Sequence, residues 1–264
     1  MKKLDKALEK INTALEREAV FFYTPEKEKP ISWIPTWIPE LDVILGGGIP
    51  RGRISEISGP FASGKTTLAV AIIASAQREG VATAFIDAEH TFSRSFAELF
   101  GVEANKLIFN RPDFGEQAIE IIESLIEADV GLIVVDSVDA MVPATMLENE
   151  PGQSVIGLHA RLMSQMCRRL IGQLAEHNTA LLLINQIRAN INPFPGAPKE
   201  TTSGGNAIKF YATIRMDIRR TGNIMEGKNV MGIKPRVRIT KNKLAPPMKE
   251  VELLMFWDGR IEVK

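Results

Sequence analysis

The sequence predicts an α/β fold in which a mostly parallel sheet is flanked by helices and continues into an antiparallel extension. As far as Phe210, apolar strand-like segments alternate with amphipathic helical segments, the order that builds a parallel sheet covered by helices. Several of these strands are apolar along their whole length, which is typical of strands buried on both faces. After Phe210, strand follows strand. With 264 residues, 45% of them hydrophobic, the chain is long enough for one large domain and a small appendage.

The appendage is expected at residues 1–30, ahead of a core at residues 31–264. Residues 2–18 carry leucine and isoleucine at helical spacing, and residues 19–23 form a strand-prone segment. A charged linker bounded by prolines follows at residues 24–30. One helix and one strand cannot bury themselves. We therefore expect this N-terminal arm either to add its strand to a neighbouring subunit's sheet, which the linker favours, or to fold back on its own core.

In the first half of the core, each element follows from a local pattern. Residues 41–45 predict a short helical turn that the following glycines stop. Residues 53–58 alternate as a strand, and residues 66–78 form an alanine-rich helix. This half is completed by a buried strand at 82–87, a short helix at 93–100, a strand at 106–109 and a helix at 116–128.

The second half begins with two apolar strands, at residues 132–136 and 180–185, separated by a long helix at residues 158–177. Five apolar residues of that helix form one stripe, which we interpret as core packing: Leu162, Met163, Met166, Leu170 and Leu174. The antiparallel extension is expected from strands at residues 212–219, 236–240 and 251–256.

The strongest local motif is Gly59-Pro60-Phe61-Ala62-Ser63-Gly64-Lys65-Thr66, which fits the pattern Gly-x-x-x-x-Gly-Lys-Thr. It lies between a predicted strand and a predicted helix, the context that a phosphate-binding loop requires. Its glycines let successive backbone N–H groups point at a polyphosphate, and the helix N-terminus adds positive potential. Lys65 would contact the β- and γ-phosphates, and the Thr66 hydroxyl would ligate Mg²⁺.

Three more polar residues follow predicted parallel strands, where open α/β sheets bind their ligands. Asp136 ends an apolar strand, the Walker-B arrangement in which an acid holds Mg²⁺ or its water. Glu89 lies two residues beyond its strand. It is either a base that polarises the attacking water or an acid at a helix N-terminus. Gln186 is placed to contact the γ-phosphate and to report its presence to the loop that follows.

The formal net charge is zero, but the charges are unevenly distributed. Residues 85–150 hold fourteen acidic and three basic residues, whereas residues 188–249 hold thirteen basic and three acidic residues. The basic half indicates a polyanionic partner, and the acidic half indicates a neighbouring basic subunit. The alternative is that both are simply solvated surfaces.

Two loops are candidates for binding a polyanion. Residues 146–153 precede the helix on which Arg161 and Arg168 share a face, and residues 189–203 lead into the glycine pair Gly204-Gly205 at a helix start. Backbone N–H groups at such a start can bind nucleic-acid phosphates. Long loops inside a compact domain are either functional or disordered, and the sequence leaves both readings open.

The composition excludes several classes of protein. Cys167 is the only cysteine, so no intrachain disulfide is expected, in keeping with a reducing cytoplasm. Its helical setting indicates packing. The N-terminus lacks the apolar run of a signal peptide, and no apolar stretch reaches 18 residues, so neither secretion nor a membrane span is expected.

Six segments together resemble the RecA strand-exchange recombinases in their bacterial form: residues 59–66, 85–90, 133–138, 185–188, 201–210 and 241–243. The resemblance covers residues 41–256, and a generic P-loop protein would match only the first and third segments. It implies a DNA-dependent ATPase that polymerises on single-stranded DNA as a helical filament, with ATP and Mg²⁺ between subunits. It also implies pairing with homologous duplex DNA in recombination and repair, in the cytoplasm and associated with the nucleoid.

The resemblance further implies roles for individual residues. ATP would be held by residues Gly59 to Thr67, by Phe96 stacked on adenine and by Asp136. Catalysis would involve Lys65, Glu89 as base, Gln186 as γ-phosphate sensor, and Lys241 and Lys243, which would reach a neighbour's ATP as an arginine finger does. DNA contacts are expected from Arg161, Ser164, Arg168, Arg188, Thr201, Thr202, Gly204 and Gly205. The N-terminal arm resembles the family's polymerisation helix and strand.

The sequence departs from the family pattern at three places. The family has an acid near Ser93 that reads the adenine amino group. The loop at residues 190–199 is proline-rich and lacks the usual basic residue at Asn190, and the sequence stops at Lys264, where bacterial relatives continue into a small C-terminal domain. These departures leave open the base selectivity, the DNA contacts of the loop, and duplex capture and regulation through that domain. Two other functions stay open: a DNA-binding mediator without strand exchange, and a ring-shaped motor of the helicase type.

Overall fold

The computed structural model describes residues 2–24, 30–148, 157–189 and 200–264. The chain divides into two compact units, Met1–Ile31 and Ser32–Lys264. The first unit contains α1 (Lys2–Ala14), none of whose residues is buried. Asn12 Oδ1 accepts the backbone N–H groups of Ala19 and Val20 at 2.8 and 2.9 Å. The chain therefore turns back at this point, and the helix is shorter than the predicted residues 2–18.

The strand expected at residues 19–23 is not formed in the single chain. Residues 18–24 adopt neither helix nor strand. A strand exists through its hydrogen bonds to a second strand, and the expected second strand belongs to another subunit. The helix of the arm is thus seen, whereas its strand and its role in polymerisation stay predictions.

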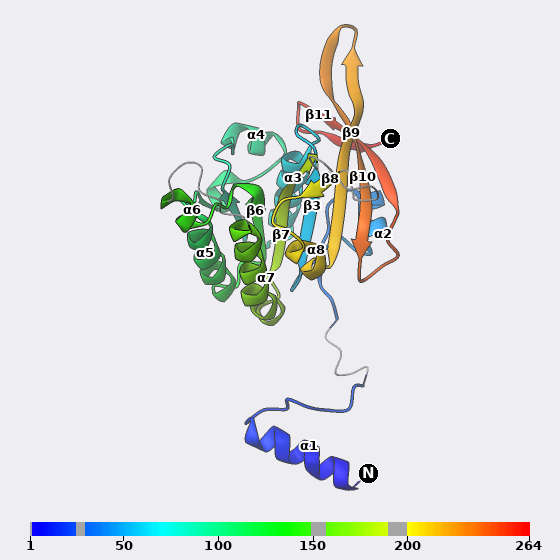
Figure 1. Ribbon diagram of the computed structural model, residues 1–264. Helices are drawn as coiled ribbons and strands as arrows, with labels where there is room; N and C mark the ends of the chain where they lie inside the picture. Colours follow the sequence, from blue (N-terminus) through cyan, green and yellow to red (C-terminus); the bar gives the residue numbers. More distant parts are fainter. Residues whose placement is uncertain (1, 25–29, 149–156, 190–199) are drawn as a thin grey trace, which may run out of the picture. The chain divides into compact units, whose positions relative to one another are not determined.

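The second unit is built on one sheet with the strand order β12-β11-β10-β9-β3-β7-β6-β4-β5, to which β8 is added beside β7. From β9 to β5 all neighbouring strands run parallel, which confirms the predicted parallel sheet. Figure 1 shows β3 and β7 in the middle of this unit. The parallel strands are β3 (Ile54–Gly59), β4 (Thr83–Asp87), β5 (Leu107–Asn110), β6 (Leu132–Asp136), β7 (Ala180–Ala189) and β9 (Ile214–Glu226).

The antiparallel extension consists of β9, β10 (Asn229–Asn242), β11 (Glu250–Phe256) and β12 (Ile261–Val263). β9 and β10 form a long hairpin whose tip projects beyond the rest of the unit (Figure 1). The sequence predicted strand only at residues 212–219 and 236–240 of this hairpin. Residues nearer the tip are mostly exposed, so they lack apolar alternation, and their strand conformation depends on cross-strand pairing.

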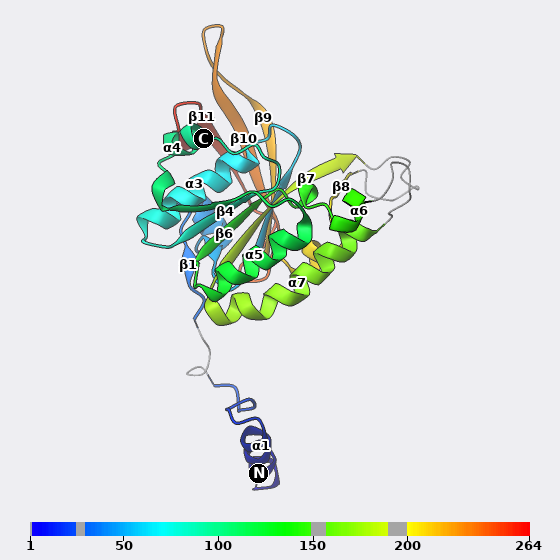
Figure 2. The same cartoon turned by 90° about the vertical axis from the view of Figure 1, so that its left-hand side faces the viewer.

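Helices cover both faces of the sheet (Figure 2), and the buried side chains form two separate cores. One core includes α3 (Lys65–Arg78) and α2 (Pro39–Leu45), and the other includes α5 (Gly115–Glu127) and α7 (Leu158–His177). Alternate residues of β6 belong to different cores: Leu132 and Val134 to the first, Ile133 and Val135 to the second. A strand that faces two cores has no polar side, which explains its uninterrupted apolar sequence.

The remaining elements are short: β1 (Trp33–Ile34), β2 (Ile49–Pro50), α4 (Arg94–Leu99), η2 (Ala104–Lys106), η3 (Val138–Ala140), α6 (Ala144–Glu148), β8 (Glu200–Thr202) and α8 (Ala207–Tyr211). β8 pairs with the end of β7, so four described residues of the expected 189–203 loop are strand: Ala189 and residues 200–202. Residues 149–153 and 190–199 of the two expected loops lie outside the described residues. Within the described ranges, no helix combines the length and apolar character that crossing a membrane requires.

Candidate functional site

The loop between β3 and α3 has the backbone geometry that its motif predicts. Gly64 caps α3 in the left-handed conformation, with φ 97°, which glycine adopts at little cost. Gly59 faces β9, where a Cβ atom would lie 2.2 Å from the carbonyl oxygen of Ile218. Lys65 Nζ donates to the carbonyl oxygen of Pro60 at 2.8 Å. The lysine therefore reaches back across the loop that would hold a phosphate.

A cavity of about 270 Å³ lies over this loop and collects residues from three further strands. Its lining comprises residues 61–67 together with Glu89, Thr91, Asp136 and Gln186. β4, β6 and β7 reach this region with their carboxyl ends, as expected for the ligand site of an open parallel sheet. The phosphate-binding loop and the three polar residues predicted beyond other strands thus come together in one place.

Ser63 gives a direct indication of what this cavity can bind. Its side chain is 2% exposed, and its Oγ atom has no hydrogen-bond partner among the described residues. A buried hydroxyl without a partner is destabilising. An oxygen-rich ligand such as a polyphosphate, held by the loop, would supply that partner.

Thr66 and Asp136 bring a hydroxyl and a carboxylate together in the cavity. Thr66 Oγ1 donates to Asp136 Oδ2 at 2.6 Å. The described residues include no cluster of three or more histidine, cysteine, aspartate and glutamate side chains that could hold a metal ion. A hydroxyl and one carboxylate suit Mg²⁺, which takes few protein ligands and completes its shell with phosphate oxygens and water.

Burial changes the titration of both charged groups beside the loop. It raises the pKa of Asp136 to about 6; the hydrogen bond from Thr66 opposes this rise, and the negative charge of Glu89 adds to it. Burial lowers the pKa of Lys65, while the charges of Asp136 and Glu89 oppose that change. Each group is thus poorly solvated in its charged form. A Mg²⁺-polyphosphate would supply opposite charges to both.

Glu89 is held by donors from two neighbouring strand ends. Ser137 Oγ donates to Glu89 Oε1 at 2.8 Å, and Gln186 Nε2 donates to the same oxygen. α4 has Ser93 as its N-cap, so Glu89 lies outside that helix and the alternative of a helix-terminal acid is wrong. Sequence reasoning missed Ser137, although its place directly after Asp136 was a usable signal.

Asp87 fixes the turn that carries Glu89, and sequence reasoning did not single it out. The side chain is fully buried. Its carboxylate accepts the backbone N–H groups of Thr91 and Phe92 at 3.0 and 3.1 Å, and Arg111 Nε at 3.0 Å. An aspartate at the start of a turn often binds backbone N–H groups in this way, so the local sequence contained the signal.

Phe96, the predicted adenine contact, does not line the cavity. It lies on α4, and its ring packs against Phe100 with 5.0 Å between centroids. Stacking of Phe96 on adenine therefore stays a prediction.

Lys241 and Lys243 are also absent from the lining of the cavity. Lys241 Nζ donates to the carbonyl oxygens of Lys209 and Phe210 at 2.7 and 2.9 Å, and Lys243 Nζ donates to Phe210 at 3.3 Å. Burial lowers the pKa of Lys241, and the positive charges of Lys243 and Arg215 lower it further. The two lysines form one positive site at the end of α8, away from their own chain's phosphate-binding loop.

The helix and glycine residues predicted to bind DNA lie close together. Arg161 and Arg168 are exposed on α7, and Ser164 between them is partly exposed. Gly204 and Gly205 have left-handed φ values of 82° and 68°, and Cβ atoms there would lie 2.8 and 2.9 Å from side chains of α7. Glycine thus allows this segment to pack directly against the helix.

Arg188, Thr201 and Thr202 lie where β7 pairs with β8. Arg188 is opposite Thr201 and forms an ion pair with Asp139. Thr202 is 8% exposed, and its Oγ1 atom has no hydrogen-bond partner among the described residues. Figure 2 shows β8 and the end of β7 on the same side of the unit as α6.

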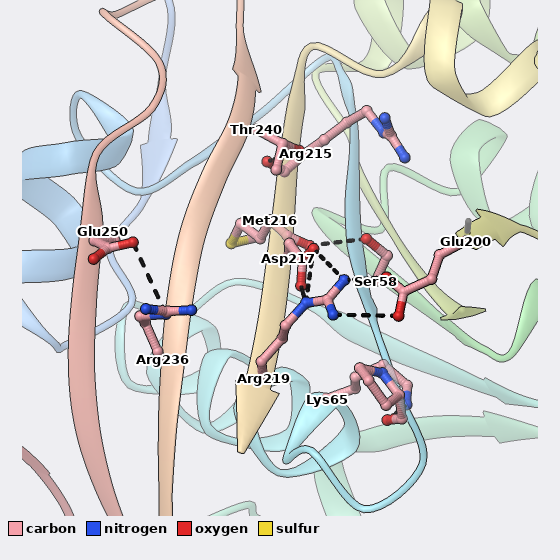
Figure 3. Close-up of polar contacts among 11 residues, drawn as sticks. Ser58, Lys65, Glu200, Arg215, Met216, Asp217, Arg219, Arg236, Thr240 and Glu250 are labelled. Atoms are coloured by element: carbon pink, nitrogen blue, oxygen red, sulfur yellow. Dashed lines mark hydrogen bonds and ion pairs between the residues drawn. The ribbon is translucent and has the colours of Figure 1, made fainter. Parts of the chain in front are cut away.

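Acidic partners neutralise part of the basic C-terminal half. At the base of the hairpin, Arg219 is bonded to Glu200 of β8 at 2.6 Å and to Asp217 at 3.0 Å (Figure 3). The hydrogen bond from Arg219 lowers the pKa of Glu200. Arg236 lies 3.9 Å from Glu250. The excess of basic residues in the sequence therefore overstates the positive charge available to a partner.

Comparison with known proteins matches the chain along almost its whole length. A family model described as RecA N-terminal domain matches residues 2–262. The RecA protein of Syntrophus aciditrophicus is 49% identical over 237 residues, which are 89% of this chain and 69% of that protein. The RecA proteins of Gluconacetobacter polyoxogenes and Thermus thermophilus are 47% and 48% identical over 98% and 96% of this chain, and over 75% and 76% of their own lengths.

Proposed function

The chain belongs to the RecA family of strand-exchange recombinases, and we propose that it is a DNA-dependent ATPase that forms filaments on single-stranded DNA and exchanges strands with homologous duplex DNA. The cavity in which the phosphate-binding loop meets Glu89, Asp136 and Gln186 carries this proposal. The mediator and ring-motor alternatives are not favoured, because the similar proteins are RecA proteins over most of the chain. We place this activity in the cytoplasm, on DNA.

The residues of the cavity divide the work of ATP hydrolysis. The loop N–H groups and Lys65 would hold the β- and γ-phosphates, and Thr66 and Asp136 would hold Mg²⁺, which neutralises charge that develops on the phosphates. Glu89, oriented by Ser137 and Gln186, would accept a proton from the attacking water.

Gln186 would connect the nucleotide to DNA. It lies in the cavity, and two residues later Arg188 pairs with the segment that leads to Gly204 and Gly205. A contact between Gln186 and the γ-phosphate would compete with its hydrogen bond to Glu89 and would shift the end of β7. ATP would thereby favour the DNA-binding arrangement, and hydrolysis would release it.

Filament formation would supply the groups that one chain lacks at its own cavity. Lys241 and Lys243 would contact the phosphates of a neighbour's ATP, where two positive charges stabilise the transition state. The arm at residues 1–30 would add its strand to the sheet of that neighbour. Within its own unit, β5 is an edge strand, and an edge strand can accept a further strand.

The test is steady-state phosphate release with and without single-stranded DNA. We expect slow hydrolysis by the protein alone and strong stimulation by single strands, because the DNA segment and the cavity are coupled. Strand exchange between homologous partners, with a heterologous duplex as control, then separates a recombinase from a mediator. Equal turnover with and without DNA would contradict the proposal.

A further inference from the structure

Glu56, in β3, is a buried carboxylate that has no part in the function proposed above. It has no exposed surface. An ionised carboxylate in a protein core is strongly destabilising unless it is paired and hydrogen-bonded. The partners of Glu56 therefore decide what it does.

Two side chains from the strands on either side donate to this carboxylate. Asn185 Nδ2, on β7, donates to Oε1 at 2.9 Å, and Arg215 Nε, on β9, donates to Oε2. Because both partners donate, the group between them has to accept a hydrogen bond at each of its two oxygens, as an ionised carboxylate does. Glu56 thus joins β7 and β9 through side chains as well as through the sheet.

Asn185 connects Glu56 to the sensor strand and to the predicted DNA segment. It directly precedes Gln186, and its Nδ2 atom also donates to the carbonyl oxygen of Ser203 at 3.1 Å, next to Gly204. Asn185 Oδ1 is buried and has no hydrogen-bond partner among the described residues. The orientation of this amide group therefore depends on its bonds to Glu56 and Ser203.

Arg215 connects Glu56 to the lysine pair. Its side chain is 17% exposed, and its backbone is paired with Lys241 of β10. The carbonyl oxygen of Arg215 accepts Thr240 Oγ1 at 3.2 Å, and Figure 3 shows these two residues side by side. The charge of Glu56 also acts at Lys241, where it opposes the lowering of the lysine pKa by burial and by Lys243 and Arg215.

We propose that Glu56 is a positioning residue that couples the nucleotide cavity to the DNA segment at Ser203–Gly205 and to the lysine pair of β10. This inference rests on the function proposed above. A displacement of β7 at Gln186 also moves the neighbouring Asn185. Through its hydrogen bonds, Asn185 then shifts Ser203 and Glu56. Because Glu56 also binds Arg215, the displacement reaches β9. ATP occupancy and DNA binding then change together, because the Glu56 carboxylate accepts hydrogen bonds from both Asn185 and Arg215.

The decisive variant is Glu56→Gln, because glutamine keeps the shape but offers one acceptor and one donor to two donors. We expect ATP binding without DNA to match the wild type. Stimulation of ATP hydrolysis by single-stranded DNA should fall by roughly tenfold or more, the effect of losing one charge-assisted hydrogen bond. ATP should also no longer raise the affinity for single-stranded DNA. The measurements are fluorescent-nucleotide binding, phosphate release and DNA anisotropy with and without ATP.

Glu123→Gln is the matched control, because Glu123 also forms an ion pair with an arginine, Arg169 of α7, but contacts neither the cavity nor the DNA segment. It should keep the wild-type stimulation. Thermal unfolding of each variant separates a change in coupling from a general loss of stability. Loss of ATP binding and stimulation in parallel with a lower melting temperature would show a structural role only and would overturn the inference.

Asn185→Ala serves if Glu56→Gln fails to fold, because it leaves the pair of Glu56 and Arg215 intact. It should reduce DNA stimulation as Glu56→Gln does, and the double variant should be no worse than either single one. Wild-type stimulation in Asn185→Ala, or additive losses in the double variant, would overturn the coupling. A wild-type protein that DNA does not stimulate would instead refute the proposed function itself.

Discussion

The nucleotide cavity and the lysine pair of β10 differ in how much of their chemistry one chain supplies. In the cavity, the phosphate-binding loop, Thr66, Asp136 and Glu89 are joined by hydrogen bonds or line one space. At the lysine pair, both ammonium groups donate to carbonyl oxygens at the end of α8. The proposed function therefore assigns nucleotide binding to groups of one chain in the first region, whereas the second region would act on another molecule's phosphates.

In the proposed function, this difference is the point at which assembly would enter the mechanism. A group that acts on a neighbour has to be stable in the free chain without its target. The carbonyl oxygens of Lys209 and Phe210 provide that stability for Lys241. They are neutral acceptors, which phosphate oxygens can replace at little cost because charge-assisted hydrogen bonds are stronger. Assembly on DNA would thereby complete an active site that the single chain leaves divided.

Of the variants that test this comparison, the double variant Lys241→Ala/Lys243→Ala should give the largest loss of DNA-stimulated hydrolysis. DNA-stimulated hydrolysis should fall by on the order of 10³-fold, as when a trans-acting cation is lost, while nucleotide binding by the free chain stays intact. Mixing it with Lys65→Ala subunits should restore activity, because some contacts then pair an intact loop with an intact lysine pair. The measurement is phosphate release at several mixing ratios.

Lys228→Ala is the control for that experiment, since Lys228 is exposed near the hairpin tip and should leave hydrolysis unchanged. If no mixture exceeds the summed rates of its two components, the lysines act within their own chain. The proposal that the lysine pair of β10 completes the nucleotide cavity of another chain would then be wrong.

Glu89→Gln should give the next largest effect and should act only on the cavity. Glutamine can still accept the hydrogen bond from Ser137 but cannot take a proton, so hydrolysis should fall by about 10²–10⁴-fold. ATP-dependent binding to single-stranded DNA should survive. Phosphate release and DNA anisotropy measure the two properties on the same sample, with Glu103→Gln, a surface variant, as control. Loss of both properties together would mean that Glu89 builds the cavity and does not act as its base.

Asp136→Asn should have the smallest effect of these variants. It should raise the free energy of unfolding of the protein in the absence of nucleotide and Mg²⁺. The pKa of Asp136 is about 6 in the folded protein against 3.8 as the ordinary value, so the folded state binds more protons than the unfolded state between these pH values. Stability therefore falls as the pH rises through this range, by ~3 kcal/mol once the group is ionised. Asparagine does not titrate and avoids this loss.

Urea unfolding at acidic and at alkaline pH tests this expectation. The variant should exceed the wild type in free energy of unfolding at alkaline pH and should match it below the ordinary carboxyl pKa. Mg²⁺-ATP should stabilise the wild type much more than the variant. An advantage of the variant that is the same at both pH values would show that the carboxylate is not held in an unfavourable environment.

Local sequence patterns were sufficient for the parallel sheet and for most of the cavity. The helix predicted at residues 158–177 is α7 with the same ends, because its apolar stripe is a local pattern. Glu89, Asp136 and Gln186 were predictable as neighbours because parallel strands bring their carboxyl ends to one edge. Ser137 and Asp87 were missed, although Ser137 directly follows Asp136 and Asp87 lies two residues before Glu89.

The hairpin and the arm show where local patterns fail. Exposed residues toward the tip of β9 and β10 carry no apolar alternation, so only their pairing makes them strands. The strand expected at residues 19–23 has the right composition and is not formed in the single chain, because strand formation needs a partner that composition cannot supply.

The sequence alone determined the fold class, the phosphate-binding loop and three polar residues beside it, Glu89, Asp136 and Gln186, since each depends on spacing along the chain. Only the tertiary structure decided that Glu56 joins Asn185 to Arg215, and that Lys241 and Lys243 lie apart from their own chain's cavity. Those facts depend on contacts between residues that are far apart in the sequence. The partners of Glu56 lie 129 and 159 positions away from it, and Lys209, which accepts from Lys241, lies 32 positions away. No periodicity or local motif encodes such contacts; they arise when the strands pair and the helices pack.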